Sequence, residues 1–305
     1  MVAFICPIYN MKNHFDYGKQ LLQSKIKCRI GGDICFIFSD IEQKDQFVSL
    51  VGDDARKMKW LILPETYKKY QAQANTKKLW GLYTLKDSYE YLVIVDVETL
   101  FLKGFDPEAV CKEVWDSRNI LVANQSYRGF FLMRQCYQTM GIYENLRLLW
   151  ETRWYRYYFW FNELQVYRAK ELDDFFLWLQ RFPLDKILNE WACFEHFLFA
   201  AFLITEKGWS LKRKKLKAYF GANEEMMLHP PVEQHRILEV LGSHWTGCRN
   251  AVNEKTVMAF HLDRQGNRID DAQAFAKEKE RCIRERRATI KQDGKTLLKH
   301  ILHIG

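Results

Sequence analysis

Short apolar runs alternate with longer amphipathic segments over residues 1–125 of the chain. Runs of aliphatic and aromatic residues that predict strands lie at 2–9, 33–40, 59–65, 91–104 and 119–127. Between them, at 10–27, 46–58 and 67–89, the apolar side chains recur at helical spacing. Continuous apolar strands separated by helices are typical of a parallel sheet that is covered on both faces. The pattern therefore predicts an α/β fold with a mostly parallel sheet flanked by helices.

The pattern changes after residue 125. A strand is expected near 159–166, a helix over 169–180, one long helix over 183–208 and a last short strand over 256–264. From residue 270 the chain is charged and poor in apolar residues, which predicts a helical extension. We therefore expect one domain over 1–268, in two halves at 1–125 and 126–268, followed by a basic helical tail at 269–305.

Polar residues follow several of the predicted strands. They are Asn10 after the first strand, Ser39 and Asp40 after the second, Asp96 and Glu98 after the fourth, and Asn124 and Gln125 after the fifth. Because the carboxyl ends of parallel strands meet at one edge, where α/β sheets bind ligands, we expect these residues to gather there.

The segment EYLVIVDVETLFLKG, residues 90–104, carries the most specific signal. Asp96 and Glu98 lie two positions apart at the tip of a buried strand, so both carboxylates can point the same way. Two neighbouring carboxylates repel each other unless a divalent cation lies between them, and oxygen ligands suit Mg²⁺ or Mn²⁺. The alternative is that Asp96 caps a turn and Glu98 is exposed.

Composition limits the class of protein. The net charge of +8 is concentrated in KRKKLK, residues 212–217, and in the tail. These runs are either solvated faces or contacts with an anionic partner such as a lipid headgroup, a phosphate or a nucleic acid. The eight cysteines contain no C-x-x-C pair, which argues against a zinc or redox motif and favours a reducing compartment.

The N-terminus lacks the basic and apolar regions of a signal peptide, and the longest apolar run, at 197–204, is too short to span a membrane. We therefore expect a cytoplasmic protein that can rest peripherally on the inner face of a membrane.

Four segments of the first 125 residues form one recognisable layout: FICPIYN at 4–10, FIFSD at 36–40, KKLWGLYTL at 77–85 and VIVDVETLF at 93–101. In this layout the first 125 residues resemble the GT-A class of nucleotide-sugar glycosyltransferases. The resemblance is one of layout, and Asp-Val-Glu stands where that class more often has D-x-D. It implies a GT-A-like fold whose first half binds the nucleotide and whose second half binds the acceptor.

The resemblance also implies roles for individual residues. Those near the base and ribose would be Pro7, Ile8, Tyr9, Asn10 and Asp40. Lys77 or Lys78 would approach the nucleotide, Asp96 would face the ribose or the metal and act in catalysis, and Glu98 would bind the metal that bridges the diphosphate. For the two lysines the alternative is a solvated helix face.

Members of this class often add a late histidine to the metal site. His261 follows the apolar run VMAF, and His244 opens the segment HWTGC, which is similar to the H-x-x-G segment of some retaining members. Each histidine could instead be structural.

An inverting enzyme also needs a general base. Glu195 stands among apolar residues on a predicted helix, where a carboxylate is either paired or functional. Weaker candidates are Glu190, Asp173 and Asp174, and a retaining enzyme would need no such base.

The aromatic, arginine-rich segment at 150–160 could stack on sugar rings or on nucleic-acid bases, or form an amphipathic core element.

Together these features favour a metal-dependent glycosyltransferase of the hexosyltransferase type. It would use Mn²⁺ or Mg²⁺ and a nucleotide-diphosphate sugar, with a UDP-sugar favoured. The acceptor would be a glycan or a lipid-linked molecule in cell-surface polysaccharide synthesis. The alternatives are a nucleic-acid-binding protein or metal-dependent nuclease, and a non-catalytic interaction protein with this fold. No nucleic-acid-binding motif is present, so we expect no nucleic-acid partner.

Overall fold

A computed structural model describes residues 1–9, 14–97, 99–101, 104–116, 118–121, 127–150, 165–212, 220–222 and 259–261. Its main sheet has five strands in the order β3-β2-β1-β4-β7. They are β1 (Val2–Pro7), β2 (Asp33–Phe38), β3 (Lys59–Ile62), β4 (Tyr91–Ile94) and β7 (Gln165–Arg168). The first four run parallel, and β7 pairs with β4 in the antiparallel direction. The predicted α/β fold with a mostly parallel sheet is confirmed.

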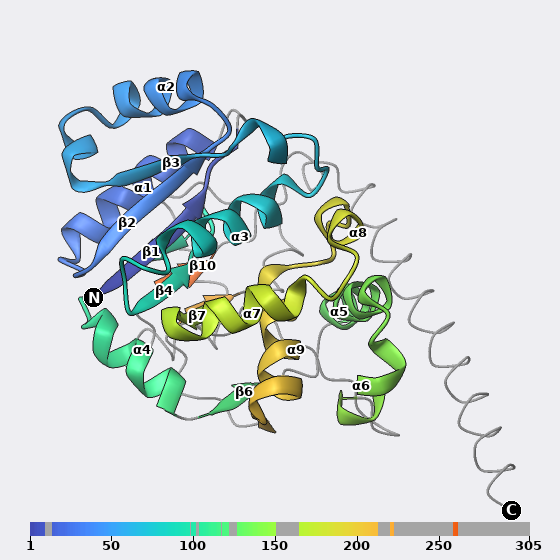
Figure 1. The fold of residues 1–305 in the computed structure, drawn as a ribbon. Helices are drawn as coiled ribbons and strands as arrows, with labels where there is room; N and C mark the ends of the chain where they lie inside the picture. The colour runs from blue at the N-terminus through green and yellow to red at the C-terminus, as the bar shows by residue number, and fades with distance from the viewer. Residues whose placement is uncertain are drawn as a thin grey trace, which may run out of the picture.

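Nine helices occur in the described part of the chain. They are α1 (His14–Lys27), α2 (Ile41–Val51), α3 (Gln73–Leu85), α4 (Pro107–Asp116), α5 (Tyr127–Met140), α6 (Tyr143–Trp150), α7 (Leu172–Leu179), α8 (Leu184–Asn189) and α9 (Glu195–Lys207). Short 3-10 helices lie at η1 (Gly52–Lys57), η2 (Glu65–Tyr67) and η3 (Ala169–Glu171). The arrangement is drawn in Figure 1.

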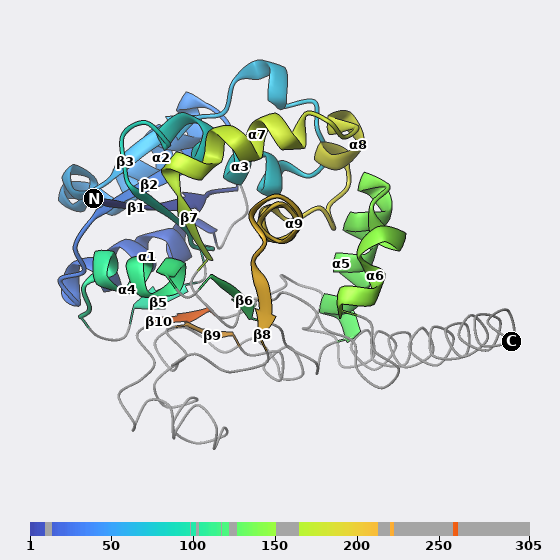
Figure 2. The same cartoon turned by 60° about the horizontal axis from the view of Figure 1, so that its bottom comes forward.

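The main sheet is covered on both faces, as its apolar strands require. Every residue of β1 is buried, and its side chains alternate between the two layers. Phe4 packs edge-on against Phe101 on the side of α1, whereas Ile5 faces Gly81 of α3. Helices α3 and α7 lie on one side of the sheet, and α1 and α4 lie on the other (Figure 2).

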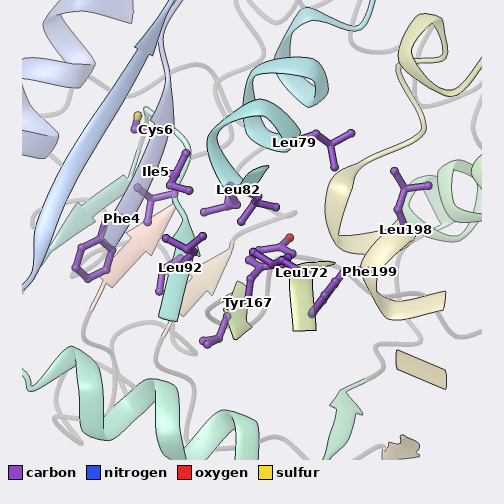
Figure 3. Close-up of a cluster of buried hydrophobic side chains, with 14 of the residues drawn as sticks. Phe4, Ile5, Cys6, Leu79, Leu82, Leu92, Tyr167, Leu172, Leu198 and Phe199 are labelled. Carbon is purple, nitrogen blue, oxygen red and sulfur yellow. The ribbon is translucent and has the colours of Figure 1, made fainter. Parts of the chain in front are cut away.

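The core between the main sheet and helix α3 contains residues that lie far apart in the sequence. Figure 3 shows Leu79 and Leu82 of α3 in one buried cluster with Tyr167 of β7 and Phe199 of α9. Tyr167 and Phe199 have ring centroids 4.8 Å apart. Strand β7 and helix α9, both from the second half of the chain, thus complete the core on this face of the main sheet.

Two smaller sheets complete the described strands. One has the order β5 (Thr99–Phe101), β10 (Ala259–His261) and β9 (Phe220–Ala222). The other pairs β6 (Asn119–Leu121) with β8 (Ser210–Lys212). The run at 119–127 therefore does not provide the fifth strand of the main sheet, because β7 takes the position beside β4.

The helix predicted over 183–208 is interrupted. It forms α8 and α9, and the chain between them, at residues 190–194, is extended or turned. The break places Glu195 at the first position of a new helix. None of the helices in the described ranges is long and apolar enough to cross a membrane.

Candidate functional site

The carboxyl ends of β1, β2 and β4 lie side by side at one edge of the main sheet. The ladder continues just beyond the strands, since the backbone N–H of Val95 donates to the carbonyl of Ile5 at 2.9 Å. Asp96 follows directly, and the N–H of Thr99 donates to its carbonyl at 2.9 Å. The chain thus turns at Asp96, directly after β4, at the edge where such sheets bind ligands.

The carboxylate of Asp96 forms an ion pair with a buried lysine. Lys78 Nζ lies 2.7 Å from Asp96 Oδ1 and 3.6 Å from Glu195 Oε1. The side chain of Lys78 is 3% exposed, that of Asp96 19% and that of Glu195 0%. One ammonium group therefore lies between a carboxylate that reaches solvent and a carboxylate that does not.

Glu195 is fully buried and lacks a hydrogen-bond partner among the described residues. Neither of its oxygens accepts a hydrogen bond from a described residue, because Lys78 and the His196 ring at 3.7 Å are both too distant. Burial by itself would raise the pKa of Glu195, but the charge of Lys78, with a smaller contribution from His196, holds this pKa below its ordinary value. Glu195 is therefore a buried carboxylate whose charge depends on Lys78.

Two residues next to this group were not singled out from the sequence. His196 follows Glu195 directly and is buried. Tyr167 is buried in β7, and its pKa is raised by burial and then by the nearby charges of Glu195 and Asp96. Position beside a predicted site residue could have pointed to His196. No sequence signal points to Tyr167, because only the pairing of β7 with β4 brings it there.

Lys77 supports the segment that follows β1. Its side chain is fully buried, its Nζ donates to the carbonyl of Ile8, and it lies 4.8 Å from the centroid of the Tyr9 ring. Burial lowers the pKa of Lys77 to about 8, although the charge of Asp40 opposes this shift. The alternative that Lys77 and Lys78 form a solvated helix face is wrong, because both are buried against the sheet edge.

Three further residues border the same edge. Asp40 caps α2, since its Oδ1 accepts a hydrogen bond from the backbone N–H of Gln43 at 2.8 Å. His14, at the start of α1, lies edge-on to Tyr9 with centroids 5.2 Å apart. Burial lowers the pKa of His14 to about 4, with an opposing contribution from Asp96 and a supporting one from Lys77. Pro7 ends β1.

Of the other residues predicted for the site, some lie within the described part of the chain and some do not. Strand β10 pairs with β5 so that His261 stands opposite Thr99, which follows Glu98 in the chain. Glu98, Asn10 and His244 lie outside the described residues, as do the segment 151–160 and the tail at 269–305. Among the described residues no group of three or more histidine, cysteine or carboxylate side chains is arranged to hold a metal ion.

The fold is similar to those of two solved structures. One is mouse xyloside xylosyltransferase 1 in its apo form, with 8% sequence identity and a TM-score of 0.44 over 86% of this chain and 98% of that one. The other is an active-site mutant of LgtC, with 10% identity and a TM-score of 0.44 over 91% of this chain and 94% of that one. At these identities the likeness concerns the fold alone. No protein-family model and no curated protein matches the sequence.

Proposed function

We propose that the protein is a metal-dependent glycosyltransferase that transfers a hexosyl group from a nucleotide-diphosphate sugar, with UDP favoured. The acceptor is a glycan or a lipid-linked molecule in cell-surface polysaccharide synthesis. The observation that carries the proposal is the group formed by Asp96, Lys78 and Glu195 at the ligand-binding edge of an α/β sheet. A carboxylate and an ammonium group side by side can bind the two components of a metal diphosphate, the cation and the phosphate oxygens.

The residues fit a divalent metal in their chemistry. Asp96 would hold it together with Glu98 and His261, and carboxylate oxygens are ligands that Mg²⁺ and Mn²⁺ prefer. The pairing of β10 with β5, which sets His261 opposite Thr99, supports including this histidine. When bound, such a metal neutralises charge on the departing diphosphate. His244 remains a second candidate ligand.

Lys78 would exchange partners on ligand binding. In the structure its ammonium group forms an ion pair with Asp96, and its Nζ lies 3.6 Å from Glu195 Oε1. When a cation engages Asp96, Lys78 can pair with Glu195 or with a phosphate oxygen. The complete burial of Glu195 therefore favours a positioning role toward Lys78 over direct action as the general base.

The segment after β1 would receive the base and ribose. Lys77 donates to the carbonyl of Ile8 and lies 4.8 Å from the centroid of the Tyr9 ring, so it supports the end of this segment at Ile8 and Tyr9. Asp40 lies at the end of the neighbouring strand β2, on the same edge of the sheet.

The test is thermal unfolding with UDP, GDP or CMP, each with and without Mn²⁺. A ligand at about 100 times its Kd stabilises the folded state by roughly 2.7 kcal/mol, which is readily measured. We expect one nucleotide to stabilise the wild type in the presence of Mn²⁺, and Asp96→Asn and Glu98→Gln to abolish this effect. Asp53→Asn is the control, because that side chain is 99% exposed and lies in η1. A shift that persists in Asp96→Asn, or no shift with any nucleotide, would refute the metal-dependent proposal.

A further inference from the structure

Five aromatic rings follow one another from η2 and the loop after it, across α3, to α7. We call them the aromatic strip: Tyr70, Tyr67, Trp80, Tyr83 and Phe176. Successive ring centroids lie 6.4, 5.5, 6.2 and 5.3 Å apart. Tyr83 is 52% exposed, and the other four are half-buried. Leu177, the next residue of α7, is 63% exposed. A contiguous, partly exposed aromatic surface of this kind marks an interaction site more often than an isolated apolar side chain does.

The strip ends in a polar pocket. Lys86 Nζ lies 5.7 Å from the centroid of the Tyr83 ring and 2.8 Å from Asp173 Oδ1. Lys86 and Asp173 line a pocket of about 360 Å³, together with Asp87, Glu90, Arg168 and Lys170. Stacking rings thus lead directly into a cluster of charged hydrogen-bonding groups.

The charged side chains of the pocket sum to no net charge, and one of their polar groups has no hydrogen-bond partner among the described residues. Three of the side chains named above are cations and three are carboxylates, so they sum to zero net charge. The Nε of Arg168 is buried and makes no hydrogen bond with any described residue. A buried guanidinium N–H without an acceptor carries a free-energy cost.

The pocket does not belong to the candidate functional site. Glu90 precedes β4, and Arg168 ends the antiparallel strand β7, opposite Tyr91. Both therefore lie at the amino end of β4, whereas Asp96 follows its carboxyl end.

We propose that the aromatic strip and the pocket together bind an uncharged oligosaccharide chain. The C–H faces of sugar rings stack on aromatic side chains, and sugar hydroxyls pair with carboxylate and guanidinium groups. The zero net charge of the pocket matches a neutral ligand better than a phosphate or an anionic lipid. The choice of a glycan rests on the proposed function, since a polysaccharide-synthesising enzyme gains from holding a growing chain away from the reacting end.

The test is native electrophoresis in gels that contain dextran, laminarin or hydroxyethyl cellulose. We expect at least one of these neutral polysaccharides to retard the wild type. Tyr83→Ala and Arg168→Gln should each weaken the apparent affinity by about fivefold or more. Trp60→Ala is the matched control, because Trp60 is also exposed, at 46%, and lies 5.0 Å from a lysine Nζ, but belongs to β3 at the far side of the sheet. It should bind like the wild type.

Three results would overturn the inference. They are no retardation by any of the polysaccharides, retardation that is unchanged in Tyr83→Ala, and an equal loss in Trp60→Ala. If the polysaccharides do not retard the protein, but it sediments with phosphatidylglycerol vesicles and Tyr83→Ala abolishes this, the strip would bind a membrane instead. Self-association that Tyr83→Ala abolishes, again without retardation, would assign it to a second copy of the chain.

The two proposals fail separately. Thermal shifts with nucleotide and Mn²⁺ should be the same in Tyr83→Ala as in the wild type. Polysaccharide binding without a thermal shift by nucleotide would support the glycan site and refute the proposed donor site. A thermal shift without polysaccharide binding would support the donor site and refute the glycan site.

Discussion

Among the described residues, Lys78 and His196 are the two with a basic group within 4.0 Å of a Glu195 oxygen. Replacing Lys78 with methionine would leave Glu195 with the His196 ring alone. At the 3.6 Å between Lys78 Nζ and Glu195 Oε1, and at an effective dielectric constant of about 20, the lost attraction is about 4.6 kcal/mol. This value agrees with the roughly 3–5 kcal/mol that breaking a buried ion pair costs. Glu195 is fully buried and cannot recover the loss through water, whereas Asp96 can.

The cost of Lys78→Met should depend on pH. In the wild type the pKa of Glu195 is lowered, so this residue stabilises the fold above its unfolded pKa, and the contribution is lost as the pH falls through the folded value. In the variant burial is the largest remaining influence and raises the pKa of Glu195, while His196 opposes this shift with smaller contributions. The folded state then binds a proton more tightly than the unfolded state, so stability falls as the pH rises. The difference between wild type and variant should therefore widen from about pH 5 to pH 8.

Urea unfolding at pH 5 and pH 8 measures this difference. We expect the double variant Lys78→Met with Glu195→Gln to recover much of the loss, because no buried charge is then left unpaired. Glu195→Gln alone should cost less, about 1–3 kcal/mol, since Lys78 keeps its ion pair with Asp96 at 2.7 Å. A cost of Lys78→Met that is the same at both pH values, or no recovery in the double variant, would refute the reasoning.

Two further predictions concern the core and the acid side of the stability curve. Gly81→Ala should destabilise the fold by about 1–3 kcal/mol in urea unfolding, because the added Cβ would lie 2.8 Å from Ile5 Cγ2. Gly31→Ala, where the nearest atom is 3.8 Å away, is the control, and equal effects would contradict this account. His14→Phe should flatten the loss of stability as the pH falls from 6.5 to about 4, because the unfolded state alone protonates His14 over that range. Urea midpoints at pH 4.5 and pH 7 test this, and an unchanged difference between them would argue against it.

Several features of the fold could be predicted because they depend on local pattern. The strands that became β1 to β4 are continuous apolar runs of the kind that a doubly covered parallel sheet needs, and the helices between them carry apolar side chains at helical spacing. Asp96 could be placed at the end of β4 for the same reason. The edge that collects Asp40 and Asp96 follows from the direction of the strands alone.

The prediction was less accurate where a long-range contact competes with local pattern. The apolar run at 119–127 looks like another strand of the sheet, but β7 pairs with β4 and leaves β6 to pair with β8. The apolar stretch at 183–208 looks like one helix, yet it breaks into α8 and α9, between which the chain packs against the start of α3. Neither choice is visible in hydrophobic periodicity, which does not identify the partner of a segment.

The class of fold, the order of the first four strands along the chain and the carboxylate at the tip of β4 could all be predicted without a structure. These depend on side-chain spacing, and spacing is a local property. Long-range packing places Lys78 between Asp96 and Glu195 and brings Tyr167 next to them. It also brings five aromatic rings, from η2, the loop after it, α3 and α7, into one row. The reason is physical: a lysine on an amphipathic helix looks solvated until the sheet against which it packs, and the charges at the edge of that sheet, are known.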